Sequence, residues 1–225
     1  MRKKVRNNKT ILASILALGC LTAASVGFSS WVIAAQKTDA TSNVNVTVDK
    51  VEDHRFDVTA FSDSKIKLAP SKLGTYISYS GSASEEKLDF TFSLTFTAKG
   101  SKAAFDFRSL GDQSFDIKFS FTNINTLNIN DSADGKTYID FPSKTIGTIS
   151  NSGFSKSSDV TTATQSNNVI TYNGKLAWGS YFGNKNPSEL DDPNKVDQYV
   201  TALNHLKKIL DNKELEIAVN IEKAA

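Results

Sequence analysis

The feature that most constrains this chain is a strict alternation of apolar and polar residues, in which phenylalanine fills many of the apolar positions. Every second side chain of residues 88–98 is apolar, and residues 115–122 repeat the pattern. Because successive side chains of a strand point to opposite faces, this period of two predicts strands with one buried face. Burial of each large apolar side chain contributes about 1.5–3 kcal/mol, so these two segments can anchor a core.

Shorter segments with the same period extend the prediction along the chain: residues 44–51, 55–61, 74–79, 103–107, 137–141, 145–149, 168–172, 176–182 and 214–222. The polar stretch 36–43 is expected to be a flexible linker, and the Ser-, Asn- and Thr-rich stretch 150–167 a long loop. Many short strands of this kind favour an antiparallel β-sandwich of jelly-roll type.

Helical spacing occurs in residues 193–211, just before the last predicted strand. Apolar side chains recur there at steps of three and four, which predicts one amphipathic helix. Asp192 is expected to cap the helix, with Pro193 as its first residue. We therefore predict a mainly β fold in which a single domain, residues 44–225, carries one helix. The apolar positions are Val196, Tyr199, Val200, Leu203, Leu206 and Leu210.

The N-terminus predicts export. Residues 1–10 hold five Lys or Arg and no acidic residue, and residues 11–35 hold no charged residue at all. Such a segment is typical of a signal peptide, here with a small-residue cleavage site after Ala34 or Ala35. It is also long enough to span a bilayer as an uncleaved signal-anchor helix, which would give the chain a membrane contact through residues 11–35. Both alternatives place the body outside the cytoplasm, extracellular or on the cell surface.

Charge and cysteine content narrow the classes of function. Beyond residue 35 the chain has 21 basic and 24 acidic residues, and this slightly acidic body argues against a nucleic-acid partner. The single cysteine, Cys20, lies in the apolar segment, so the body has no disulfide and no thiolate zinc site. Lipidation of Cys20 is disfavoured because apolar residues rather than a polar tether follow it.

The most distinctive segment is Trp178–Pro187, WGSYFGNKNP. Strand parity predicts that Trp178 is a core residue and that Tyr181 points the other way, between glycines. An exposed aromatic beside a Gly/Asn loop could stack on a sugar. The candidate ligand-binding residues are therefore Tyr181, Asn184 and Asn186.

Residues 130–135, NDSADG, have the start of a calcium-loop pattern. Asn130, Ser132 and Asp134 fit its first, third and fifth positions, but Phe141 replaces the bidentate glutamate at the twelfth. Asp134 followed by glycine also favours a simple turn. The alternatives are a turn without a cofactor and weak Ca²⁺ binding.

No catalytic pattern stands out. The two histidines, His54 and His205, do not have the spacing of a zinc protease. The carboxylate pairs 85–86 and 191–192 are adjacent in polar segments, whereas glycosidases place carboxylates across a cleft. We therefore expect these carboxylates to be solvated and the protein not to be an enzyme.

Two segments carry a resemblance to known proteins. Residues 25–33, SVGFSSWVI, and Trp178–Pro187 resemble a group of exported proteins of low-GC Gram-positive bacteria to which no activity is attached. The layout is more distantly similar to the TasA/camelysin group, in which a long signal precedes a jelly roll with a helical insertion. That resemblance implies a role in extracellular matrix fibres.

These observations lead to two functional hypotheses. The first is an exported structural or matrix protein that self-associates through an edge strand, for example by adding residues 44–51 to the sheet of a neighbouring copy. The second is a binding module for a glycan or cell-wall ligand that uses Tyr181 and the loop 183–187.

Overall fold

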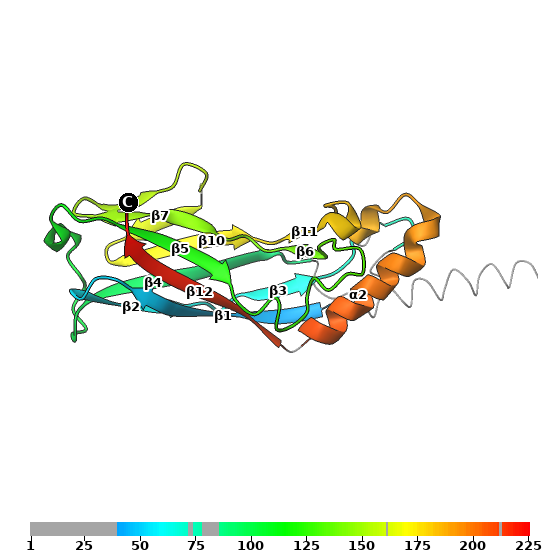
Figure 1. Ribbon diagram of the computed structural model, residues 1–225, viewed down its shortest axis with the longest axis horizontal. Coiled ribbons are helices and arrows are strands. Elements are labelled where there is room, and N and C mark those ends of the chain that lie inside the picture. The colour runs from blue at the N-terminus through cyan, green and yellow to red at the C-terminus, as the bar shows by residue number, and fades with distance from the viewer. Residues whose placement is uncertain (1–39, 72–73, 78–85, 161, 212) are drawn as a thin grey trace, which may run out of the picture.

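The computed structural model describes residues 40–71, 74–77, 86–160, 162–211 and 213–225. The predicted signal or anchor segment 1–35, with Ala34 and Ala35, lies outside these residues. The body is mainly β, as predicted, with one α-helix before the final strand. The elements form an elongated molecule with α2 (Val196–Leu210) at one end (Figure 1).

The larger sheet has six strands in the order β3-β1-β12-β5-β7-β8. The first strand, β1, pairs in parallel with the last, β12, while the other neighbours are antiparallel. The prediction of a purely antiparallel arrangement is therefore wrong at this pair. The strands are β3 (Lys65–Leu68), β1 (Ala40–Val51), β12 (Lys213–Lys223), β5 (Phe115–Phe121), β7 (Lys144–Ser150) and β8 (Gly153–Lys156).

The parallel pair follows from the position of α2. The helix ends beside the start of β1, so β12 begins there and runs in the same direction as β1 (Figure 1). Parallel strands need such a long connection, whereas a tight turn would make them antiparallel.

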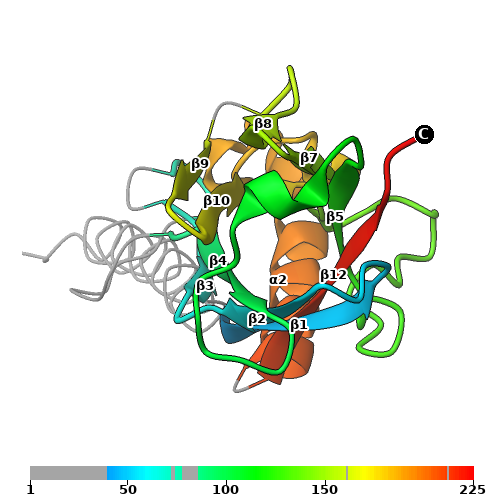
Figure 2. The same ribbon diagram turned by 90° about the vertical axis from the view of Figure 1, so that its left-hand side faces the viewer.

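The smaller sheet has four antiparallel strands in the order β2-β4-β10-β9, and a further short pair joins β11 to β6. Figure 2 looks along the long axis from the end opposite α2 and shows strands of both sheets around the interior. These strands are β2 (Phe56–Phe61), β4 (Asp89–Ala98), β10 (Val169–Lys175), β9 (Ala163–Ser166), β11 (Ala177–Trp178) and β6 (Ile139–Asp140).

Aromatic side chains from both sheets meet in the core. The ring of Phe119 on β5 lies 5.6 Å from that of Phe92 on β4 and 5.0 Å from that of Tyr172 on β10, centroid to centroid. At the other end of the sheets, Phe56 meets Phe115 edge to face at 6.2 Å. Such tilted and edge-on pairs are the favoured geometries of aromatic packing. The alternation predicted for β4 and β5 is confirmed, because their phenylalanine, leucine and isoleucine residues are buried.

The helix is confirmed with a modified start. Asp192 Oδ1 accepts from the Asn194 amide at 3.0 Å and caps a short 3₁₀ turn, Pro193–Lys195, which leads into α2. Its buried face includes Ala202 in place of the predicted Val200, which is only half-buried. Among the described residues no helix is long and apolar enough to cross a membrane.

The bounds of several elements differ from the predictions, because short strands of mostly polar residues resemble loops in the sequence. The predicted linker 36–43 already contains the start of β1, where Ser42 is buried and its Oγ donates to the Lys213 carbonyl at 2.7 Å. The predicted loop 150–167 contains the edge strands β8 and β9, and β3 was not predicted. The predicted strand 103–107 is reduced to one bridge, Thr97 with Ala104.

Two more predicted strands are wrong in part. Of the strand predicted at 74–79, residues 75–77 form bends, and residues 78–79 lie outside the described ranges. The strand predicted at 176–182 stops at Trp178, because the carbonyl of Thr137 accepts from the Tyr181 amide and the chain enters a 3₁₀ turn, Ser180–Phe182. A Cβ at Gly179 would lie 2.3 Å from that same carbonyl, so this close approach requires glycine.

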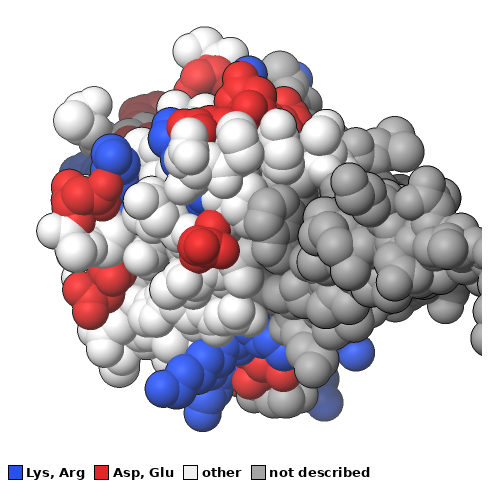
Figure 3. Space-filling model, turned by 90° about the vertical axis from the view of Figure 1, so that its right-hand side faces the viewer, with Lys and Arg blue, Asp and Glu red and all other residues white. Residues whose placement is uncertain are grey.

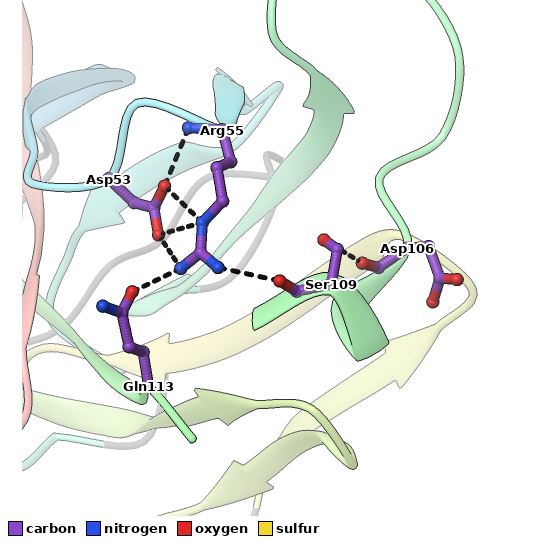
Figure 4. A network of polar contacts seen from close by, with 5 residues as sticks. All are labelled: Asp53, Arg55, Asp106, Ser109 and Gln113. Atoms are coloured by element: carbon purple, nitrogen blue, oxygen red, sulfur yellow. Dashed lines mark hydrogen bonds and ion pairs between the residues drawn. The ribbon is translucent and has the colours of Figure 1, made fainter. Parts of the chain in front are cut away.

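A guanidinium held by an ion pair connects two segments at the end opposite α2. Arg55, next to β2, pairs with Asp53, whose side chain is only 5% exposed. The same guanidinium donates from Nη1 to the Ser109 carbonyl at 2.7 Å and from Nη2 to Gln113 Oε1 at 2.5 Å (Figure 4). Ser109 in turn donates Oγ to the Asp106 carbonyl at 2.7 Å. One guanidinium thus joins the turn after β1 to the segment that enters β5.

Replacement of Asp53 should weaken the fold in a pH-dependent way. Hydrogen bonding to Arg55 lowers the pKa of Asp53, so its contribution is present above the unfolded carboxyl pKa and is lost as the pH falls. We expect Asp53→Asn to cost about 1–3 kcal/mol in urea unfolding at neutral pH, and less in acid. The exposed pair Asp57–Lys99 provides the control: Asp57→Asn should cost clearly less. An equal decrease in the free energy of unfolding for both variants would contradict the stabilising role of Asp53.

Candidate binding cavity

A cavity of about 700 Å³ lies beside the segment that connects β11 to α2. Its floor contains Ser188 and Leu190, which are buried, while Glu86, Tyr76 and Asn186 are half-buried. The mouth is formed by exposed hydroxyl and carboxylate side chains. The full lining is Ser71, Thr75, Tyr76, Glu86, Asn186, Ser188, Glu189, Leu190 and Asp191.

Charged side chains border this end of the molecule. Figure 3 views the end that carries α2: acidic side chains are prominent along its upper edge, several basic ones gather along its lower edge beside an acidic group, and the area between is mostly uncharged apart from one acidic group. The cavity itself is lined by three carboxylates and by no lysine or arginine among the described residues. Its field therefore favours neutral or positively charged ligands.

The side-chain amide of Asn186 joins three segments of the chain in the wall of the cavity. Its Oδ1 accepts from the Ser188 amide at 2.9 Å, from Ser188 Oγ at 2.7 Å and from the Ser71 amide at 3.2 Å. Its Nδ2 donates to the Ala69 carbonyl at 3.1 Å and to Glu86 Oε1 at 2.7 Å. One amide thus cross-links residues that are more than 100 positions apart.

Glu86 receives a second hydrogen bond on the same oxygen. Trp178 Nε1 donates to Glu86 Oε1 at 2.5 Å, and Trp178 is only 4% exposed, so its role as a core residue is confirmed. Burial raises the pKa of the Glu86 carboxyl, although both hydrogen bonds and the charge of Lys175 oppose that rise. The expectation of a solvated 85–86 pair is therefore wrong for Glu86.

Gly74 allows the wall to pack closely behind Ser188. A Cβ at this position would lie 2.8 Å from the Ser188 Cβ and 1.8 Å from the Ile77 carbonyl oxygen. No side chain fits there, so glycine is required by close approach rather than by a turn.

The structure brings only one of the three predicted ligand residues to the cavity. Asn186 lines it, whereas Tyr181 is half-buried in an aromatic cluster, 4.8 Å from the ring of Tyr138 and 6.0 Å from that of Tyr199. Asn184 is exposed in a turn with a φ of 59°. The sequence missed Glu86 because its partners lie 92 and 100 residues away, a separation that no local pattern reveals.

The predicted calcium-loop residues make bonds within the loop and to its neighbours. Asn130 Oδ1 accepts from the Tyr138 and Ile139 amides at 2.8 and 3.0 Å, and Asp134 pairs with Lys136 at 2.7 Å. Ser132 Oγ donates to the Lys136 carbonyl. Its own carbonyl accepts from the glycine at position 135, as expected for a turn. Within the described ranges no three His, Cys, Asp or Glu side chains are grouped to hold a metal ion.

Comparison with protein-family models, with curated proteins and with solved structures finds no match for this chain. The cavity is therefore interpreted from its own geometry and chemistry.

The raised pKa of Glu86 predicts the pH dependence of a variant. A raised carboxyl pKa contributes stability that is present below the unfolded pKa, about 4.3, and is lost as the pH rises through the folded pKa. Glu86→Gln keeps an oxygen acceptor for Trp178 and Asn186 but does not titrate. We expect its thermal midpoint to rise relative to the natural chain as the pH increases from about 4 to neutral.

Glu52 provides the control of opposite sign. A hydrogen bond from the Lys223 amide, followed by one from Lys50, lowers the pKa of Glu52. The midpoint of Glu52→Gln should therefore fall relative to the natural chain over the same pH range. A parallel pH course for the two variants would contradict the assigned environment of Glu86.

Proposed function

We propose that this chain is an exported protein of the cell surface whose β domain binds a glycan in the cavity beside Asn186, without catalysing a reaction. The observation that carries the proposal is the lining of the cavity. Amide, carboxylate and hydroxyl groups converge there beside a half-buried tyrosine, Tyr76. Small-ligand sites usually have volumes of about 300–1,000 Å³ and a mostly apolar lining, so the mostly polar lining of this cavity favours a hydroxylated ligand such as a sugar over an apolar one.

The N-terminal sequence supports the location. Five cations followed by 25 uncharged residues are typical of an export signal or signal anchor. The two facing sheets also support the proposal that the exported body is a jelly-roll-like sandwich. Glu86 supports a binding role rather than a catalytic one, because Trp178 and Asn186 hold its Oε1 as part of the wall.

Two tyrosine variants test the glycan site. We expect Tyr76→Ala to weaken binding of a cell-wall oligosaccharide at least about tenfold, or ~1.4 kcal/mol, because an aromatic platform is lost from the lining. Tyr181→Ala is the matched control, since Tyr181 lies outside the lining and should change affinity little. Calorimetry on the full chain in detergent measures both. Lack of any oligosaccharide binding, or loss with Tyr181→Ala alone, would refute the proposal.

The matrix hypothesis keeps one specific observation in its favour. Phe61 is 67% exposed and lies on β2, which in the described part of the chain is an edge strand with β4 as its one hydrogen-bonded neighbour. Residues 44–51 are a poor donor strand, because β1 is already paired with β12 and β3. Self-association, if it forms the matrix, is therefore proposed to use β2.

A substitution at this edge tests self-association. Phe61→Ser should weaken association of the full chain at least about tenfold, measured by sedimentation in detergent. Thr164→Ser, on the other edge strand of the same sheet, should leave association unchanged. A natural chain that is monomeric at every concentration would remove the hypothesis.

A further inference from the structure

We propose that the ligand of this cavity is an amino sugar with a free, protonated amine, which binds against Glu86. This inference rests on the proposed glycan site and adds the charge of the ligand. It follows from the charge of the lining, from the hydrogen bonds of Glu86 and from the polar groups around it.

The described residues of the lining carry negative charges and no positive ones. Glu86, Glu189 and Asp191 contribute carboxylates, and no described lining residue is a lysine or an arginine. Lys175 attracts the charge of Glu86 but does not line the cavity. A neutral sugar would leave these carboxylates without a counter-charge, whereas an ammonium group supplies one.

Glu86 is positioned to receive that group. Both hydrogen bonds found for its carboxylate, from Trp178 and from Asn186, end on Oε1 and come from neutral donors. A carboxylate has about four lone-pair positions, and the hydrogen bonds found among the described residues leave those of Oε2 unused. Half-buried in the wall, this carboxylate has lost part of its hydration, so a cationic donor from the cavity improves its environment.

Hydroxyl groups complete the site for a sugar ring. Thr75 and Tyr76 lie in the lining with Glu86, and Ser188 lies at the floor. A free metal ion fits less well, because no three acidic, histidine or cysteine side chains of the described residues are grouped around one point. An organic cation that carries its own hydroxyl groups matches both features.

The test compares two oligosaccharides that differ in the amine. Calorimetry on the full chain in detergent would use a glucosamine oligomer and an N-acetylglucosamine oligomer of equal length, at a pH where the free amine is protonated. We expect the glucosamine oligomer to bind at least about tenfold more tightly. Glu86→Gln should reduce that preference to less than about threefold. Glu214→Gln, exposed on β12 outside the lining, should retain it.

Each outcome has a distinct meaning. Equal binding of the two oligomers, with loss of both on Tyr76→Ala, would overturn the charge inference and leave the glycan function intact. Failure of both to bind would overturn both proposals. A lysine-rich peptide or Ca²⁺ that displaces the glucosamine oligomer at equal concentration would overturn the assignment to a sugar. If Glu86→Gln does not fold, Asp191→Asn at the mouth is the second variant and should also reduce the preference.

Discussion

The packing of aromatic side chains between the two sheets is the interaction on which the rest of the structure depends. Phe92 and Tyr172 from the smaller sheet meet Phe119 from the larger one, with ring centroids 5.0–5.6 Å apart. The body has no cysteine, so this burial, rather than disulfides, must offset the entropy of ordering the chain. Once the sheets are fixed face to face, the connections at their ends are held close together and can assemble polar groups.

The polar groups at the two ends of the sheets have different roles. Opposite α2, Arg55 donates hydrogen bonds to Asp53, Ser109 and Gln113, which makes a structural network. Beside α2, Asn186 and Trp178 hold Glu86 in a cavity in which its carboxylate has hydrogen bonds but, among the described lining residues, no cation. A guanidinium that donates to protein groups from two segments supports the fold, whereas a half-buried carboxylate facing a cavity has capacity left for a ligand.

The sequence predicted those strands and the helix whose buried face can be recognised from the spacing of apolar residues within the element itself. The alternation in β4, β5 and β12 and the spacing in α2 required only local information, and their buried faces are confirmed. Edge strands such as β8 and β9 have mostly exposed residues, so they resemble loops in sequence. The site was found only in part, through Asn186. Glu86 could not be found, because its partners come from distant segments and its polar neighbours suggested a solvated surface.

The central claim, that the cavity at Glu86 is a ligand site, is tested most directly by the indole N–H resonance of Trp178. The chain has two tryptophans, so two such signals are expected in a nitrogen–proton correlation spectrum of the full chain in detergent. Because Trp178 donates to Glu86, a ligand that engages this carboxylate should shift one indole signal progressively with concentration, and Glu86→Gln should abolish the shift. An unchanged Trp178 signal under conditions in which the oligosaccharide is bound would contradict the account.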